Sequence, residues 1–83
     1  MEITIDCGGI ATKQELHAHI AEALDFPGWY GNNLDALMDC LTDLDETTVT
    51  LTGCDRMGFD ADGFWETFED AERENPNLTV IWE

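Results

Sequence analysis

Residues 27–42 read PGWYGNNLDALMDCLT, and this stretch decides how the chain is organised. Glycines on both sides of Trp29 and Tyr30 predict a flexible loop, in which the two aromatic rings are not both buried. Asn32 or Asn33 can accept a free amide at the start of a helix, so we expect a helix to begin there. Three leucines at helical spacing predict its buried face: Leu34, Leu37 and Leu41.

The same helix carries aspartates on its opposite side. Asp35, Asp39 and Asp43 are four residues apart, which places them in one exposed row. Like charges at this spacing destabilise an isolated helix by roughly 0.2–0.5 kcal/mol per pair. The row is either a solvated helix face or, because it adjoins the loop with Trp29 and Tyr30, a protein-binding surface of carboxylates and aromatic anchors.

A second acidic row is predicted near the end of the chain: Glu66, Asp70 and Glu74. Nineteen acidic residues face only three basic ones, Lys13, Arg56 and Arg73. We expect Arg73 to pair with Glu69 on the preceding turn, which leaves Asp70 and Glu74 free. Most carboxylates of the chain therefore lack an internal partner.

The residues on either side of this stretch predict three strands and two more helices. Residues 1–6 alternate, and residues 47–52 are rich in β-branched side chains, so both are expected strands. Residues 12–15, TKQE, form a capping box for a helix that Pro27 ends. Residues 78–82 are almost continuously apolar, which predicts a strand covered on both faces.

Residues 53–60 are expected to be a loop or a short broken helix, and residues 61–74 a helix with Phe64, Phe68 and Ala71 inward. Strands joined through helices run parallel, with right-handed crossovers. The predicted fold class is therefore α/β, a three-stranded parallel sheet packed by three or four helices. Residues 1–83 are expected to form a single domain.

The formal net charge of −16 restricts the possible partners. Such a chain repels nucleic acids and anionic membranes and attracts basic proteins. The bulk acidity has a second explanation, because a halophile-like composition keeps a surface hydrated in a saline host. The placement of particular acids, and not their number, has to indicate the function.

Catalytic and cofactor chemistry have no support in the sequence. His17 and His19 are two residues apart on a helix and point to different faces, so we expect packing at the surface or in a groove, not a metal pair. No phosphate-binding loop, nucleophile elbow or zinc-protease motif is present. The start of the chain is acidic, no apolar stretch is long enough to span a membrane, and the three cysteines are expected to be free thiols. We expect a cytoplasmic protein that is not an enzyme and has no cofactor.

The run from Pro27 to Thr42 resembles the signature of the barstar family, the intracellular inhibitors of barnase-type ribonucleases. The family pattern is roughly Tyr-Tyr-Gly-x-Asn-Leu-Asp-Ala-Leu-x-Asp-Cys-Leu, and this chain departs from it only at Trp29. The resemblance covers essentially the whole chain. The segment of residues 53–59 is shorter than the corresponding segment of the family, so we expect the short third helix of the family to be trimmed here.

The resemblance implies an acidic protein that inserts its second helix and the preceding loop into a ribonuclease active site. Asp39 would be the central residue with Asp35 beside it, and Trp29 would contact the region of the catalytic histidine. The remaining implied or adjoining contacts are Tyr30, Gly31, Asn33, Thr42, Asp43 and Asp70. Met38 and Leu44 stand where the best-known member has tryptophans, which suggests a different partner enzyme.

The expected partner is a basic ribonuclease of the barnase type, with a protective, immunity-like role for the host, and the free chain is expected to be a monomer. The main alternative is a barstar-fold module that binds another basic protein, such as a toxin or a nucleic-acid-binding domain. A third possibility is an acidic partner that acts only through solubility. Changing Asp39 to alanine separates these hypotheses.

Overall fold

The computed structural model describes all residues 1–83 and contains one three-stranded sheet. The strands are β1 (Glu2–Asp6), β2 (Thr47–Thr52) and β3 (Leu78–Trp82), in the spatial order β1-β2-β3. Both pairs are parallel, with Ile3 opposite Val49 and Val49 opposite Val80. The predicted parallel sheet is confirmed.

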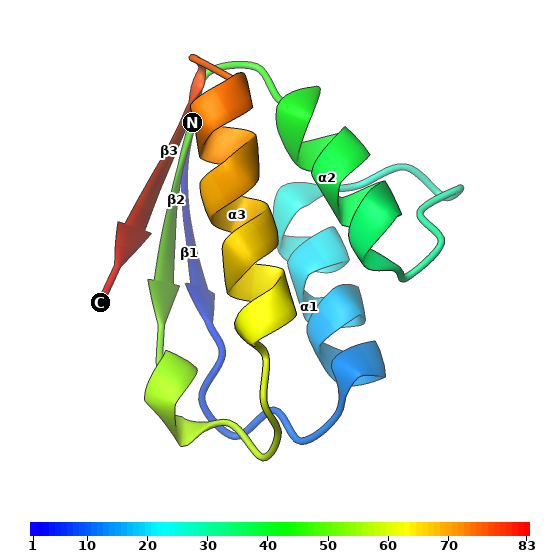
Figure 1. The fold of residues 1–83 in the computed structure, drawn as a ribbon, viewed down its shortest axis with the longest axis vertical. Helices are drawn as coiled ribbons and strands as arrows, with labels where there is room; N and C mark the ends of the chain where they lie inside the picture. Colours follow the sequence, from blue (N-terminus) through cyan, green and yellow to red (C-terminus); the bar gives the residue numbers. More distant parts are fainter.

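Three α-helices pack on one side of this sheet (Figure 1). They are α1 (Lys13–Leu24), α2 (Leu34–Thr42) and α3 (Asp62–Glu74). A single 3₁₀ turn, η1 (Cys54–Arg56), follows β2, so the trimmed third helix predicted for this segment is reduced to one turn. The α/β fold class is therefore confirmed, with three helices and no fourth.

Local signals start and stop these elements as physical chemistry requires. The Thr12 hydroxyl accepts the amide of Glu15 at 3.1 Å and in turn donates to the Glu15 carboxylate, which completes the predicted cap of α1. Gly53 ends β2 with φ of 71°, where an added Cβ would lie 2.7 Å from the backbone nitrogen of Gly8. Only glycine fits this turn, because both the angle and the space exclude a side chain.

The core lies between the sheet and the helices. Fifteen buried residues form one hydrophobic cluster. Phe68 is its largest fully buried side chain, and Leu37 and Leu41 of α2 belong to the same cluster. Phe64, Phe68 and Ala71 face inward as predicted. None of the helices is long and apolar enough to cross a bilayer.

Two burial predictions are wrong. Thr79 and Ile81 of β3 are exposed on the far face of the sheet, which no helix covers, and Trp82 is exposed at the end of the strand. The apolar run belongs instead to an edge strand whose outward amides are bonded locally: Leu78 to the Asn75 carbonyl at 3.1 Å and Val80 to the Glu72 carboxylate at 2.7 Å. Leu34 is also exposed, since it sits at the first turn of α2 and reaches sideways toward α3.

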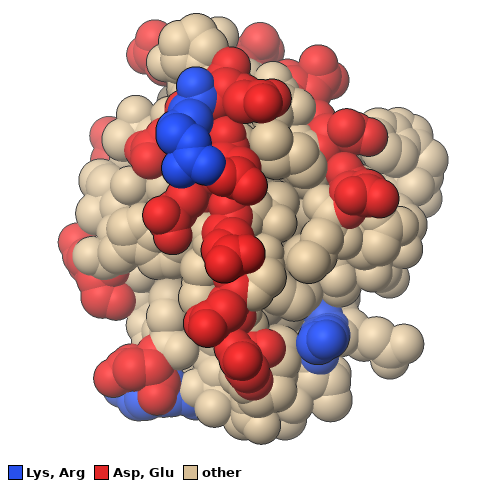
Figure 2. Space-filling model, in the orientation of Figure 1, with Lys and Arg blue, Asp and Glu red and all other residues tan.

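Helices α2 and α3 lie side by side along their whole length, joined at both ends. At their starts, a Cβ added to Gly63 would lie 3.1 Å from Cδ1 of Leu34. At their ends, the buried Asn75 side chain donates to the carbonyl oxygens of Leu41 and Leu44, each at 3.0 Å. The helices therefore run parallel, and both carry acidic residues on the same side of the molecule (Figure 2).

Candidate protein-binding surface

The aspartate row of α2 is exposed along its length. Asp35, Asp39 and Asp43 all lie in solvent, and none of them forms an ion pair. Asp35 stands in the first turn, where the helix dipole favours a negative charge, whereas Asp39 and Asp43 have no such compensation. Figure 2 shows acidic side chains over α2 and along the length of α3. This face of the molecule offers carboxylates with unfilled acceptor positions.

The pairing expected on α3 is wrong in one respect. Arg73 forms its ion pair with Asp70, three residues earlier, and not with Glu69. Both spacings bring side chains together on a helix, so spacing alone does not choose between them. The side chains of Arg73 and Asp70 are 69% and 52% exposed, and such pairs are worth at most about 1 kcal/mol. Asp70 is thus paired, but by a contact that a stronger partner can replace.

Asp70 lies on the α2 side of its helix. It follows Gly63 by two turns, and Gly63 contacts Leu34 of α2. Between Asp70 and the aspartate row lie Met38 and Thr42, which are both half-buried. The surface therefore has acids on two neighbouring helices and a less polar strip between them.

The two aromatic residues of the loop before α2 differ in their burial. Trp29 is 65% exposed and points away from the core, whereas Tyr30 is half-buried. The Tyr30 ring packs on Phe26 with a centroid distance of 5.1 Å, and its hydroxyl lies 2.6 Å from Nδ1 of His17. Burial raises the pKa of Tyr30 to about 12, so the hydroxyl keeps its proton. Tyr30 thus anchors the loop, and Trp29 is the residue that it presents.

The helix start is built by residues that the resemblance assigns to partner contacts. The Asn33 side-chain oxygen accepts the amide of Ala36 at 2.7 Å, which makes Asn33 the cap of α2. Its amide nitrogen lies 3.4 Å from the carbonyl oxygen of Gly31, and both residues are exposed. The capping role of Asn33, one of the two asparagines considered, is confirmed, whereas its contact to a partner stays a prediction.

Comparison with known proteins places the chain in a family. The family model described as Barstar (barnase inhibitor) matches residues 1–53. A protein of Bacillus subtilis (strain 168) named "Putative ribonuclease inhibitor YrdF" is 35% identical over 79 residues, which cover 88% of this chain and 87% of that protein. The chain belongs to the barstar family. Its match to the family model therefore includes β1, α1, the loop, α2 and β2, and it stops at Gly53, the residue before the 3₁₀ turn.

The rim of the surface in this barstar family member is aliphatic at Met38 and Leu44. Met38 and Leu44 are half-buried and pack against the core cluster. The Thr42 hydroxyl donates to the carbonyl oxygen of Met38 at 2.9 Å, so it offers a partner only its acceptor positions. Trp29 is the one large aromatic side chain beside α2 that is mostly exposed.

His17 is the residue near this surface that sequence reasoning placed wrongly. It is 5% exposed, its ring lies 4.6 Å from that of Phe64, and it holds the Tyr30 hydroxyl. The signal was present, because His17 precedes the buried Ile20 by three residues and so belongs to the inward side of α1. His19 remains exposed. No group of three or more His, Cys, Asp or Glu side chains is arranged to hold a metal ion.

The buried His17 predicts a loss of stability in mild acid. Burial lowers the pKa of His17 below its ordinary value of 6.5. The unfolded chain therefore binds the proton more readily, and the free energy of unfolding falls as the pH drops below about 6.5. We expect the free energy of unfolding, measured with urea, to be lower at pH 5.5 than at pH 7.5. This difference should be smaller in a His17→Gln variant. Equal declines in both proteins would contradict this origin.

Removing the cap of α2 is expected to cost stability. An Asn33→Ala variant loses the acceptor for the Ala36 amide, which is worth about 1 kcal/mol in the free energy of unfolding. Urea denaturation measures this loss. Asn32→Gly is the matched control, because Asn32 has φ of 54° and caps nothing. A loss in the control as large as in Asn33→Ala would refute the assignment of the cap.

Proposed function

We propose that this barstar family member inhibits a basic ribonuclease by placing α2 and its preceding loop in the enzyme's active site. The observation that carries the proposal is the exposure of Asp35 and Asp39 on α2 with no intramolecular cation, beside the exposed Trp29. The names of the family and of the relative, which refer to barnase and ribonuclease inhibition, support the same function.

The chemistry rests on the likeness between a carboxylate row and an RNA backbone. A ribonuclease holds phosphates with Arg, Lys and His side chains, and carboxylates can accept the same charge-assisted hydrogen bonds. Asp39, in the middle of α2, would take the central position, with Asp35 on one side and Asp43 on the other. The like charges of the row repel one another in the free protein, and a basic pocket relieves that repulsion.

The other contacts follow from their positions around α2. Trp29 would stack in the enzyme's active site near the catalytic histidine, while Tyr30 anchors the loop to the core. Gly31, Asn33 and Thr42 would supply flanking polar contacts, while Met38 and Leu44 would form a small apolar rim. Asp70 would exchange Arg73 for a cation of the enzyme. We infer no catalysis, because the acids lie on a convex helix face without the pocket that general acid–base chemistry needs.

The protein would act as a single-domain cytoplasmic monomer that protects its host from a ribonuclease. The net charge of −16 favours encounter with a basic enzyme, although salt shortens this attraction to about 10 Å at 0.1 M and about 3 Å at 1 M. At high salt the affinity would therefore rest on direct contacts by Asp39, Asp35 and Trp29.

The test is a pull-down of basic proteins from host lysate on the immobilised protein, followed by an RNA-cleavage assay, with barnase as the reference enzyme. We expect a retained protein whose RNA cleavage stops when this protein is added in equimolar amount. Met38 and Leu44 at the rim are smaller than the tryptophans of the best-known member, which favours a partner other than barnase itself. A retained basic protein without RNA-cleaving activity would instead support the second candidate, a binding module for another basic protein.

A further inference from the structure

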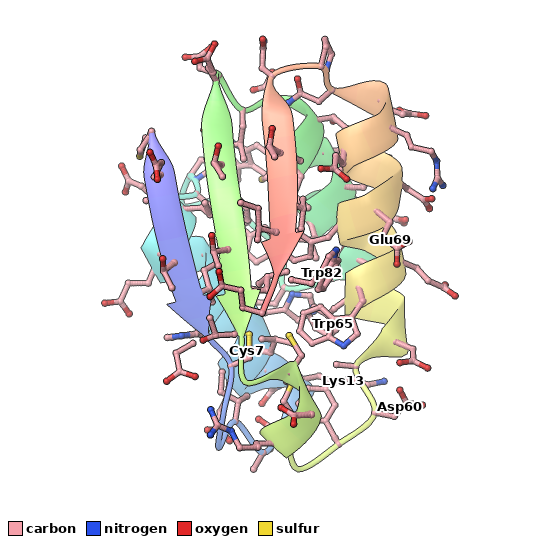
Figure 3. The ribbon with its side chains drawn as sticks, turned by 90° about the vertical axis from the view of Figure 1, so that its left-hand side faces the viewer. Cys7, Lys13, Asp60, Trp65, Glu69 and Trp82 are labelled. Atoms are coloured by element: carbon pink, nitrogen blue, oxygen red, sulfur yellow. The ribbon has the colours of Figure 1, made fainter.

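A concave feature lies on the other side of α3, away from the convex acidic face of α2. A cavity of about 390 Å³ opens at the end of β3 and is lined by four residues: Cys54, Trp65, Glu69 and Trp82. Figure 3 shows Trp65 and Trp82 next to each other, with Glu69 above them on the helix. Trp65 and Glu69 are one turn apart on the β3 side of α3, whereas Gly63 and Asp70 lie on the α2 side. The proposed inhibitory surface leaves this cavity uncovered.

The two tryptophans pack edge to face, and their nearly perpendicular planes form a corner. Their ring centroids are 5.7 Å apart and their planes meet at 83°. Trp65 is held from behind by Phe64 and Phe68, each with a centroid distance of 6.4 Å. Trp82 is 43% exposed. A half-buried wall fixed by the core and a second, exposed wall give a preformed aromatic corner, which loses little freedom when a ligand enters it.

The charge at the corner is negative and has no counterpart in the chain. Glu69 is exposed and forms no ion pair, because Arg73 pairs with Asp70 instead. The remaining basic residues, Lys13 and Arg56, form no salt bridge with Glu69 either. Indole faces carry the negative side of a quadrupole, so they add to the attraction that the carboxylate exerts on a cation.

The mixture of two indoles and one carboxylate selects among cations. Metal ions such as Ca²⁺ require six to eight oxygen ligands, and this cavity supplies one carboxylate. A neutral apolar ligand would use the rings but not Glu69. A cation with an apolar surface uses both, since its methyl groups contact the ring faces while its charge faces the carboxylate. We propose that the Trp65–Trp82 corner binds the trimethylammonium group of an organic cation.

The test compares choline with its uncharged isostere, 3,3-dimethylbutan-1-ol, in titrations of the full chain followed by the NMR signals of the indole N–H groups. We expect choline to shift the signals of Trp65 and Trp82 but not Trp29, and to bind at least about fivefold more tightly than the neutral alcohol. Equal affinities for the two compounds, or shifts of all three indoles together, would overturn the proposal. Sodium chloride at matched ionic strength controls for general screening.

Two variants with the same change of charge sharpen the test. Glu69→Gln is expected to weaken choline binding by roughly two- to fivefold, the range of an exposed ion pair. Glu66→Gln removes a carboxylate from the same helix outside the cavity, so we expect a smaller effect. An equal loss in both variants would mean that the protein attracts choline only through its net charge, and would refute the site. Because Glu69 is exposed, this comparison does not depend on a core substitution that could unfold the chain.

A trimethylammonium group can belong to a free metabolite or to a methylated lysine of a protein. A peptide with one trimethyllysine, and the same peptide with unmodified lysine, form the second arm of the titration. Preference for choline assigns the corner to a small molecule, and preference for the methylated peptide over both choline and the unmodified peptide assigns it to a protein. The absence of binding by either trimethylammonium compound would refute the proposal while leaving the ribonuclease assay of α2 unaffected.

Discussion

An Asp39→Ala variant is expected to bind the ribonuclease at least about 30-fold more weakly than the unchanged protein, the loss that defines a binding hot spot. Asp39 lies in the middle of the exposed row of α2, between Asp35 and Asp43. At the centre of an interface its carboxylate would be removed from water and surrounded by cationic side chains. Truncation then leaves those cations buried without a partner, which costs more than the lost contact itself. Barstar complexes are among the systems on which these general values were established.

The control for this variant is Asp62→Ala. It makes the same change of charge at an exposed position in the first turn of α3, so both variants reduce long-range attraction equally. Isothermal titration with the retained ribonuclease measures both. We expect Asp62→Ala to change the dissociation constant only a few-fold, as is usual for a charge outside the centre of an interface. Equal losses in the two variants would indicate an acidic protein that acts through bulk charge, the solubility hypothesis.

A Phe68→Ala variant is expected to lower the free energy of unfolding by about 3–5 kcal/mol. Phe68 is completely buried in the core cluster, so the removal of its ring leaves a cavity. A small domain has a total stability of about 5–15 kcal/mol, so this loss brings it close to unfolding. Because α3 and α2 are joined through Leu34–Gly63 and through Asn75, we expect the aspartate surface to lose its order at the same denaturant concentration.

Ile81→Ala is the counterpart on the uncovered face of the sheet. Ile81 is 41% exposed, and its removal is expected to cost at most about 1 kcal/mol. Urea denaturation followed by circular dichroism measures both variants. A loss in Ile81→Ala comparable with that in Phe68→Ala would mean that the far face of β3 is covered in solution.

The apolar periodicity of the sequence was sufficient to predict most of the fold. The stripes of α2 and α3 repeat at helical spacing and are buried as expected, with Leu34 as the exception. A cap at Asn32 or Asn33 was predicted because the asparagine side chain has a specific role at a helix start, and the structure assigns it to Asn33. The burial of the last strand was not predicted correctly. A continuous apolar run is compatible both with a strand covered on two faces and with an edge strand that leaves Ile81 and Trp82 in solvent.

Only those features of the candidate surface that lie within one helix could be predicted from the sequence. The spacing of Asp35, Asp39 and Asp43 was sufficient to place them in one exposed row. The choice of Asp70 by Arg73 depends on rotamers, which spacing does not determine. The bond between Tyr30 and His17 joins residues thirteen positions apart on different elements, and it forms only when the loop folds back over α1. The tryptophan corner likewise requires α3 and β3 to be assembled.

The most direct test of the account is competition between this protein and a nucleic-acid ligand for the same ribonuclease. The dissociation constant for the ribonuclease is measured at increasing concentrations of an oligodeoxynucleotide, which the enzyme binds but does not cleave. If the α2 carboxylates take the place of RNA phosphates, the apparent dissociation constant rises linearly with the oligonucleotide concentration. A constant value, with protein and oligonucleotide bound to the enzyme together, would contradict that claim.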